Sequence, residues 1–122
     1  MIWHIFVKKN MVVYPNCKIN LGLNVISKRP DGYHNIESVF YPVPWCDMLE
    51  IIPSEKNSFI FDGIGMQCPL EENLCYKAWD LVRKQFDIPG ISLFLYKKIP
   101  FGAGLGGGSS DGAFVLKVLN DL

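Results

Sequence analysis

Apolar and polar residues alternate along the first half of the chain with the two-residue period of a β-strand. Between residues 18 and 25 every second side chain is apolar, which predicts a half-buried strand with Ile19, Leu21, Leu23 and Val25 on one face. The sequence Arg-Pro-Asp-Gly at 29–32 suits a type I turn, so the chain is expected to reverse there. Residues 36–43, 48–52 and 58–61 are short β-rich runs that predict antiparallel strands.

A helical period replaces this alternation in the second half of the chain. Asn73 is a suitable N-cap, and the apolar residues that follow it recur at helical spacing until Pro89-Gly90: Leu74, Ala78, Leu81, Val82 and Phe86. Residues 91–96 predict another strand, and a second helix is expected after the glycine-rich residues 102–108. The predicted apolar stripe of that helix consists of Ala113, Val115, Leu116, Leu119 and Leu122.

The sequence at each end of the chain suggests whether the domain is complete. The second predicted helix continues to the last residue without a capping glycine, which favours a truncated domain over a helix that docks and simply ends. Truncation would expose apolar surface, so self-association is expected. Residues 1–10 suit neither a membrane span nor a signal peptide, and they are interpreted as an extension or a misplaced start before Met11.

Composition narrows the class of protein. A length of 122 residues with 49% apolar content suits one globular domain. The 12 basic and 12 acidic residues balance, so nothing favours nucleic acid or a membrane surface, and a small-molecule ligand is expected. The four cysteines include no C-x-x-C pair and lie far from both histidines, which argues against zinc. They are expected to be free thiols in a cytoplasmic protein, although a secreted chain could form two disulfides.

The strongest chemical signal is the segment 102–110, Gly-Ala-Gly-Leu-Gly-Gly-Gly-Ser-Ser, between a predicted strand and a predicted helix. Glycines permit positive φ angles and close approach of a ligand to the backbone. The amides and dipole of the following helix favour a phosphate, and the two serine hydroxyls can bond phosphate oxygens or a phosphate-bound Mg²⁺. A flexible linker or plain turn is the alternative, but five glycines in seven positions exceed what a turn requires.

Two other phosphate-binding loops compete with this interpretation. The Walker loop requires Gly-Lys-Ser/Thr, and the absence of lysine excludes it. Gly102, Gly104 and Gly107 match the spacing of the dinucleotide fingerprint, but any glycine-dense segment does so. Only 15 residues follow Gly107, too few to reach the acidic ribose-binding residue about 20 positions further on. A dinucleotide-dependent oxidoreductase is therefore the less favoured function.

Three segments in order resemble the GHMP kinases. Residues 100–111, Pro-Phe-Gly-Ala-Gly-Leu-Gly-Gly-Gly-Ser-Ser-Asp, resemble the phosphate loop of that family. Residues 15–23 and 28–34, the latter Lys-Arg-Pro-Asp-Gly-Tyr-His, look like N-terminal signatures of the branch that phosphorylates a cytidine-diphosphate methylerythritol. Cys17 and Gly112 stand where alanine is usual in the family, and neither difference removes a functional group.

The resemblance implies an α+β fold of the ribosomal protein S5 domain 2-like type, a mostly antiparallel sheet with helices packed on one side. Residues 11–122 would be an incomplete ATP-binding domain that lacks its C-terminal companion. The implied reaction is ATP- and Mg²⁺-dependent phosphorylation of the 2-hydroxyl of cytidine-diphosphate methylerythritol, a step of non-mevalonate isoprenoid synthesis. The chain alone is expected to be inactive, because the presumed aspartate base would lie beyond residue 122. A stand-alone nucleotide-binding module without catalysis is the alternative.

The resemblance also implies roles for individual residues. Lys18 would assist catalysis, and Asn20, Tyr33 and His34 would bind the substrate. Asn73, Leu74 and Lys97 would lie on the adenine side of ATP. The ATP phosphates would be held by Pro100, Gly102, Ala103, Gly104, Leu105, Gly106, Gly107, Gly108, Ser109 and Ser110, with Ser110 also meeting Mg²⁺.

Structural roles compete with several of these assignments. Lys18 and Asn20 share one strand face, which could be a solvated surface or could point a cation and an amide toward a phosphate. Tyr33 and His34 could pack in a loop rather than stack on a pyrimidine. Asn73 could be only a helix cap. The aromatic residues in strands and helices are expected in the core or at an interface, namely Phe40, Tyr41, Trp45 and Trp79.

Overall fold

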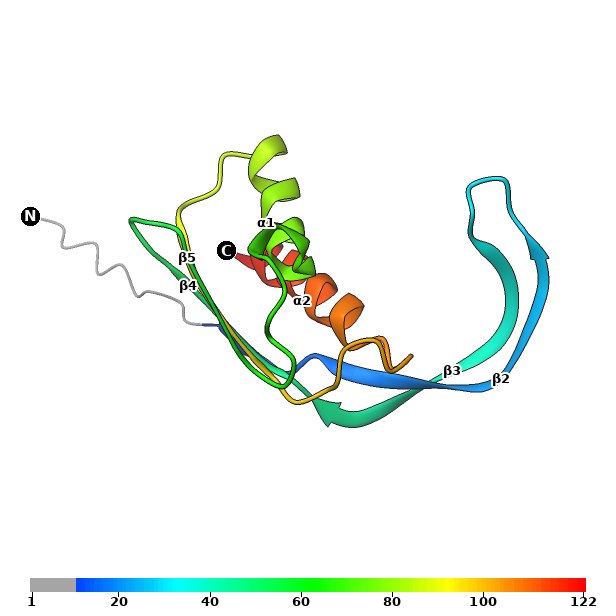
Figure 1. Cartoon of the computed structure of the whole chain (residues 1–122). Coiled ribbons are helices and arrows are strands. Elements are labelled where there is room, and N and C mark those ends of the chain that lie inside the picture. Colours follow the sequence, from blue (N-terminus) through cyan, green and yellow to red (C-terminus); the bar gives the residue numbers. More distant parts are fainter. Residues whose placement is uncertain (1–10) are drawn as a thin grey trace, which may run out of the picture.

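The computed structural model describes residues 11–122, and the predicted N-terminal extension, residues 1–10, lies outside the described residues. The described chain forms strands, two α-helices and one short 3₁₀-helix (Figure 1). In chain order these are β1 (Met11–Val13), β2 (Asn16–Lys28), β3 (His34–Cys46), β4 (Met48–Pro53), β5 (Ser58–Gly63), η1 (Leu70–Glu72), α1 (Leu74–Gln85), β6 (Ile91–Lys97) and α2 (Gly107–Asp121).

A four-stranded sheet with the order β1-β4-β6-β5 forms the base of the molecule. β4 pairs antiparallel with both β1 and β6, but β5 pairs parallel with β6. The prediction that 58–61 forms a strand is therefore confirmed, whereas its expected antiparallel direction is wrong. The reason is the connection: β5 reaches β6 through η1 and α1, and a helical crossover returns the chain in the same direction.

Both α-helices pack on one face of this sheet, as the α+β prediction requires (Figure 1). The core lies between the two layers and is formed by residues from β4, β6, α1 and α2, namely Leu49, Ile51, Cys75, Ala78, Trp79, Ile91, Leu93, Leu95, Val115, Val118 and Leu119. Alternate residues of β4 and β6 enter it because their side chains alternate between the sheet faces. This core fixes the end of β6 against the start of α2, where the glycine-rich segment lies.

The predicted helix stripes are only partly correct. In α1 the predicted Ala78 is buried, but Leu74, Leu81 and Phe86 are exposed, and the helix buries Cys75 and Trp79 instead. In α2 the predicted Val115 and Leu119 are buried together with Val118, whereas Ala113, Leu116 and Leu122 are exposed. Helix α1 therefore presents small and aromatic residues to the core, and α2 presents valines and a leucine. The exposed Leu74, Leu81 and Leu116 line the groove where the two helices meet.

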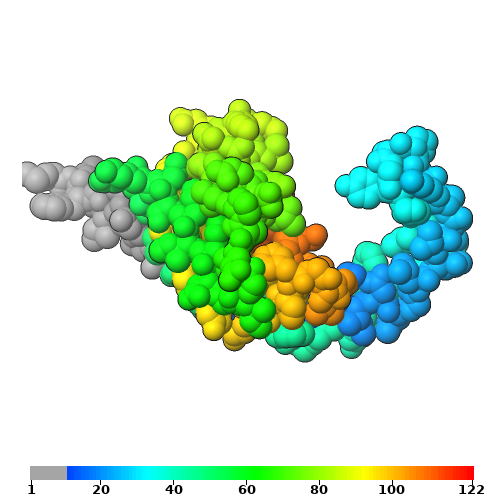
Figure 2. Space-filling view, in the orientation of Figure 1, coloured from blue at the N-terminus to red at the C-terminus, as the bar shows by residue number. Residues whose placement is uncertain are grey.

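Strands β2 and β3 form a separate antiparallel hairpin that projects away from the sheet and curves upward at its tip (Figures 1 and 2). Its turn is the predicted one, because the Gly32 amide donates to the Arg29 carbonyl at 3.1 Å. The predicted half-buried strand at 18–25 is wrong in two respects. Its alternation is broken by a bulge at Gly22, and its apolar positions are exposed.

The exposure of the hairpin also corrects the assignment of its aromatic residues. Trp79 lies in the core as predicted, packed edge-on against Phe59 at a ring-centroid distance of 4.8 Å. In contrast, Phe40, Tyr41 and Trp45 are exposed on β3, so they do not lie in the core, and their place at an interface stays a prediction. Alternating apolar residues predict a strand correctly, but they do not say whether that strand meets a partner layer.

Candidate functional site

The glycine-rich segment forms the connection between β6 and α2, and its backbone requires glycine. Gly102, Gly104 and Gly106 have φ angles of 68°, 73° and 68°, and no residue of another type has a positive φ in the described chain. A Cβ atom at Gly102 or Gly104 would meet nothing within 4 Å, so these two glycines are needed for backbone conformation and not for space. The left-handed residues turn the chain sharply into the helix.

The first turn of α2 begins inside the glycine run. Gly106 occupies the N-cap position and provides no side-chain cap for the helix amides. A Cβ on Gly107 would lie 2.8 Å from a methyl carbon of Ile99 and 2.9 Å from Lys97 Nζ, so only glycine permits the helix to start this close to the end of β6. The first amides of a helix have no intrahelical acceptor, and the helix dipole adds positive potential there. The start of α2 is thus suited to an anion.

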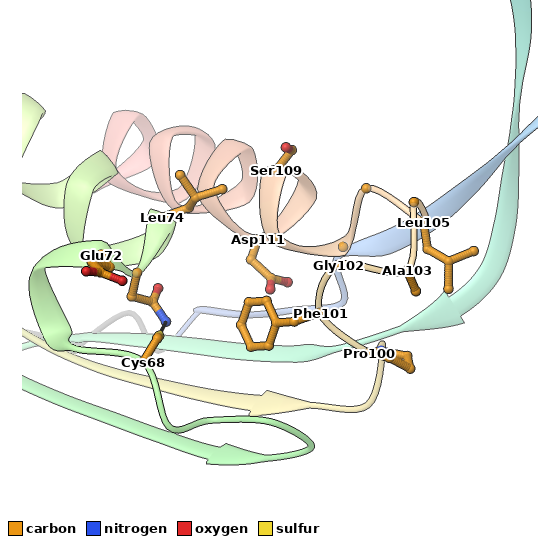
Figure 3. A pocket seen from close by; sticks show the side chains of 15 residues that line it. Cys68, Glu72, Leu74, Pro100, Phe101, Gly102, Ala103, Leu105, Ser109 and Asp111 are labelled. Atoms are coloured by element: carbon orange, nitrogen blue, oxygen red, sulfur yellow. Dashed lines mark hydrogen bonds between the residues drawn. The ribbon is translucent and has the colours of Figure 1, made fainter. Parts of the chain in front are cut away.

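A cavity of about 410 Å³ opens between this loop and the start of α1 (Figure 3). Most of the predicted phosphate-binding residues line it, from Pro100 through Gly102 to Ser109, and the predicted Asn73 and Leu74 line it from the opposite side. Ser110 does not line the cavity; its amide instead donates to the Gly106 carbonyl at 3.0 Å. Sequence reasoning missed four lining residues: Cys68, Glu72, Phe101 and Asp111.

Lys18 and Asn20 contact the loop from β2. Lys18 Nζ donates to the Gly104 carbonyl at 2.8 Å and to Asn20 Oδ1 at 2.5 Å, and the Lys18 amide donates to the Leu105 carbonyl at 2.9 Å. The two side chains therefore share a strand face, and that face meets the glycine loop. A cation at the outer edge of an anion-binding loop adds favourable charge for a bound phosphate.

Asn73 has the predicted capping role. Its side-chain oxygen accepts from the Cys75 amide at 2.8 Å, which satisfies one of the unpaired amides at the start of α1. The residue is also buried and borders the cavity, so capping and ligand contact are compatible at this position. Cys68 Sγ lies 4.0 Å from the Asn73 side-chain nitrogen at the same edge.

Lys97 lies beneath the cavity and does not line it. Its ammonium is completely buried and donates to Asp47 Oδ2 at 2.5 Å and to Asp111 Oδ2 at 2.9 Å. The same ammonium lies 5.0 Å from the centre of the Phe101 ring. A direct contact with the adenine side of a nucleotide remains a prediction, since this side chain is completely buried and does not line the cavity.

The two carboxylates around Lys97 differ in acidity. Burial raises the pKa of Asp111 to about 7; the hydrogen bond to Asp47 also raises it, and Lys97 acts to lower it. Burial also acts to raise the pKa of Asp47, but hydrogen bonds from Lys97, Asp111 and two backbone amides lower it below its usual value. Those amides belong to Lys98 and Ile99 and donate to Asp47 Oδ1 at 2.6 and 2.9 Å. Asp47 is therefore the permanent anion of this cluster.

Tyr33 and His34 do not line the cavity. Both lie at the turn of the β2–β3 hairpin and are exposed, with 74% of Tyr33 accessible. The tip is held by local contacts: the Tyr33 amide donates to Asp31 Oδ1 at 3.1 Å, and Arg29 pairs with Asp31. Their predicted contact with substrate stays a prediction, because the hairpin tip lies apart from the glycine loop (Figure 2).

All four cysteines are free, as predicted. Within residues 11–122, acidic, cysteine and histidine side chains form no group of three that could hold a metal ion. No helix in that part of the chain is long and apolar enough to cross a membrane.

Comparison with known proteins agrees with the arrangement of loop and helices. Residues 73–122 match the family model described as the GHMP kinases N terminal domain. The chain is 56% identical over 111 residues to a 4-diphosphocytidyl-2-C-methyl-D-erythritol kinase of Parabacteroides distasonis, and 54% identical over 112 residues to one of Cytophaga hutchinsonii. These alignments cover 91% and 92% of this chain but only 41% and 42% of those relatives. The chain thus spans about two fifths of their length.

Solved structures show the same relationship. A crystal structure of 4-(cytidine 5'-diphospho)-2C-methyl-D-erythritol kinase superposes with a TM-score of 0.75 at 39% identity, covering 91% of this chain and 40% of that one. A homoserine kinase from Cytophaga hutchinsonii superposes with a TM-score of 0.60 at 17% identity, covering 99% of this chain and 38% of that one. The second likeness concerns the fold alone.

Proposed function

We propose, on the premise that residues 73–122 belong to the family of GHMP kinase N-terminal domains, that this chain binds the phosphates of ATP in its glycine loop. The observation that carries the proposal is the open start of α2, where three left-handed glycines and an uncapped first turn face a cavity of about 410 Å³. Unpaired amides and the helix dipole provide the attraction for an anion. We propose that the domain extends over residues 11–122.

The proposed reaction is transfer of the γ-phosphoryl group to the 2-hydroxyl of 4-diphosphocytidyl-2-C-methyl-D-erythritol. Support comes from the kinases of that name that are 56% and 54% identical to this chain over 111 and 112 aligned residues. Phosphoryl transfer depends mainly on positioning and neutralisation of charge. Lys18 is placed for the second task, because its ammonium bonds the Gly104 carbonyl at the edge of the loop.

Other residues extend the proposed site. Asn20 holds the Lys18 ammonium, and we assign Tyr33 and His34 to the cytidine part of the substrate. We assign Asn73 and Leu74 to the adenine side, since both border the cavity opposite the loop. Lys97 would act there only indirectly, through the residues above it.

Mg²⁺ would accompany the nucleotide and neutralise charge on its phosphates. Mg²⁺ usually keeps several waters and takes one or two protein ligands in addition to phosphate oxygens. Ser110 was the residue predicted to meet it, but Ser109 lines the cavity and Ser110 does not. Of the two hydroxyls, the one on Ser109 is therefore better placed.

We propose the complete kinase activity only for a protein as long as the related kinases. The expected aspartate base lies outside residues 1–122, so this chain would bind ATP without turning it over. Addition of the remaining part of the protein should produce ADP release that depends on the cytidine substrate. ATP binding that never leads to ADP release in the longer protein would instead favour the nucleotide-binding module. We propose a cytoplasmic location, consistent with four free thiols.

Substitution of Gly104 by alanine tests ATP binding at the loop. Gly104 has a φ of 73° and open space around it, so alanine would strain the backbone without any clash. Strain of about 1–2 kcal/mol should weaken binding of ATP by about tenfold, measured by calorimetry with Mg²⁺ present.

The matched control is Gly32→Ala. Gly32 also has a positive φ, 88°, and nothing within 4 Å, but it lies in the turn between β2 and β3. Its alanine variant should lose a similar amount of stability and keep the affinity for ATP. Equal loss of affinity in both variants, or none in either, would remove the loop from the proposed function.

A further inference from the structure

The buried cluster of Asp47, Lys97 and Asp111 connects the two ends of the glycine loop. Asp47 Oδ1 accepts from the amides of Lys98 and Ile99, which begin the loop after β6. Asp111 lies in the second turn of α2, after the loop has ended. Lys97 donates to both carboxylates at once, so a single ammonium ties the entrance of the loop to its exit.

Three further contacts join this cluster to the cavity above it. Gly107 packs directly on the Lys97 ammonium, since a Cβ there would lie 2.9 Å from Nζ. The ring of Phe101, which lines the cavity, lies over the same ammonium. Asp111 also lines the cavity, and its Oδ1 is buried without a hydrogen-bond partner among the described residues (Figure 3). The cluster is therefore the floor of the anion site.

The charge of that floor depends on one proton. When Asp47 and Asp111 are both ionised, the two carboxylates and the Lys97 ammonium give the cluster one net negative charge beneath the proposed phosphate site. With a proton on Asp111, the cluster is neutral, and the helix amides above it act on the anion without opposition. A bound polyphosphate and an ionised Asp111 would repel each other through a poorly hydrated region, where charges interact strongly.

We propose that Asp47, Lys97 and Asp111 form a positioning triad that holds the glycine loop in its anion-binding form, and that Asp111 takes up a proton when a polyphosphate binds. This inference rests on the proposed function, because it concerns the same loop. It assigns roles to Asp47 and Asp111 that neither the loop motif nor the likeness to known kinases provides.

The other ionisable groups around Asp111 do not replace it in this role. Asp47, from the turn before β4, stays ionised because hydrogen bonds hold its pKa below the usual value, and it pairs with Lys97 from β6. Burial, followed by the charge of Asp111, raises the pKa of Cys75 on α1, so its thiol stays neutral. Glu72 from η1 lines the same cavity and is exposed, so water screens its charge.

The test measures binding of inorganic triphosphate by this chain between pH 5.5 and pH 8.5. Asp111→Asn keeps an oxygen acceptor for Lys97 but cannot take up a proton. The triphosphate titrates in the same way for every variant, so the ratio of the wild-type affinity to that of Asp111→Asn isolates the side chain. That ratio should fall with rising pH, by about tenfold if the bound anion raises the pKa of Asp111 by about one unit.

Two further variants separate positioning from general damage. Asp111→Ala removes the hydrogen bond to Lys97 and should weaken triphosphate binding at every pH. The amides of the glycine loop should also exchange hydrogen faster in this variant. Asp111→Asn should restore both the affinity and the slow exchange. Asp80→Asn removes a carboxylate on the outer face of α1, where it pairs with Arg83 and Lys84, and should keep the wild-type pH profile.

Each result decides the matter. Parallel pH profiles for the wild type and Asp111→Asn, both binding triphosphate, would overturn the proton-linked triad and leave the proposed function standing. Loop exchange and affinity in Asp111→Ala equal to those of the wild type would overturn the positioning role. Absence of triphosphate binding in the wild type would overturn the proposed function, and the inference with it.

Discussion

Single residues around the glycine loop combine structural and chemical roles. Asn73 caps α1 and borders the cavity, Lys18 bonds the loop carbonyl at Gly104, and Gly107 lets the helix start directly on Lys97. Residues that the backbone requires at these positions thus also shape the cavity. This explains why the loop residues were identifiable from the sequence: their glycines satisfy a local backbone requirement that is visible without the fold.

Asp111 should make the stability of the chain depend on pH. Its pKa in the folded chain is about 7, against an ordinary value of 3.8, so between these values the folded state keeps a proton that the unfolded state has released. Stability should therefore fall as the pH rises from about 4 to about 7 and then level off, by up to roughly 4 kcal/mol at about 1.4 kcal/mol for each unit of pKa. Urea unfolding at a series of pH values measures this.

Asp111→Asn is the decisive variant for that prediction. The amide cannot titrate, so the decline between pH 4 and pH 7 should largely disappear. Asp47, whose pKa is lowered, acts in the opposite direction and only below about pH 4, where its protonation removes stability. An unchanged decline in Asp111→Asn would assign the effect to another group.

At the scale of whole elements, helix α1 shows why apolar spacing predicts a helix more reliably than its buried face. The predicted stripe and the observed one share Ala78 and the partly buried Val82, but the core also takes in Cys75 and Trp79, each next in sequence to a predicted residue. Large apolar residues occur on several sides of this helix, and only the position of the sheet decides which of them are buried. The leucines left exposed lie along the groove between α1 and α2.

Substitution of Trp79 should test this choice of face. Trp79 is 5% exposed and packs against Phe59 and Tyr76, so Trp79→Ala should lower the free energy of unfolding by about 3–5 kcal/mol. Leu81 was predicted to be in the stripe but is 53% exposed, so Leu81→Ala should cost less than about 1 kcal/mol. Equal losses in chemical denaturation would mean that α1 is rotated from the position described.

On the scale of the whole molecule, the hairpin of β2 and β3 is the most exposed apolar feature. Its residues Leu21, Leu23 and Val25 are each more than half exposed, as are Val39, Phe40 and Tyr41 on the paired strand. The register places Leu21, Val39 and Tyr41 on one face of the hairpin and Leu23, Val25 and Phe40 on the other. Exposed apolar surface of this kind favours association. These exposed residues are the surface through which self-association is predicted.

The chain should form dimers or larger species at micromolar to millimolar concentrations, detectable by light scattering after size-exclusion chromatography. Leu21→Thr combined with Leu23→Thr should shift the distribution toward monomer, because threonine keeps the preference for a strand and reduces the apolar surface. Ile60→Thr, at an equally exposed site on β5, should leave it unchanged. A wild-type chain that stays monomeric throughout would refute the prediction.

The residues alone determined the strands, the two α-helices, the Asn73 cap, the turn at 29–32 and the glycine loop before α2, because each follows from local periodicity or from the backbone freedom of glycine. Only the tertiary structure decided the parallel pairing of β5, the buried face of each helix and the exposure of the hairpin. It also brought together Asp47, Lys97 and Asp111, which are up to 64 positions apart in the sequence. Such contacts depend on how layers pack, and no local pattern contains that information.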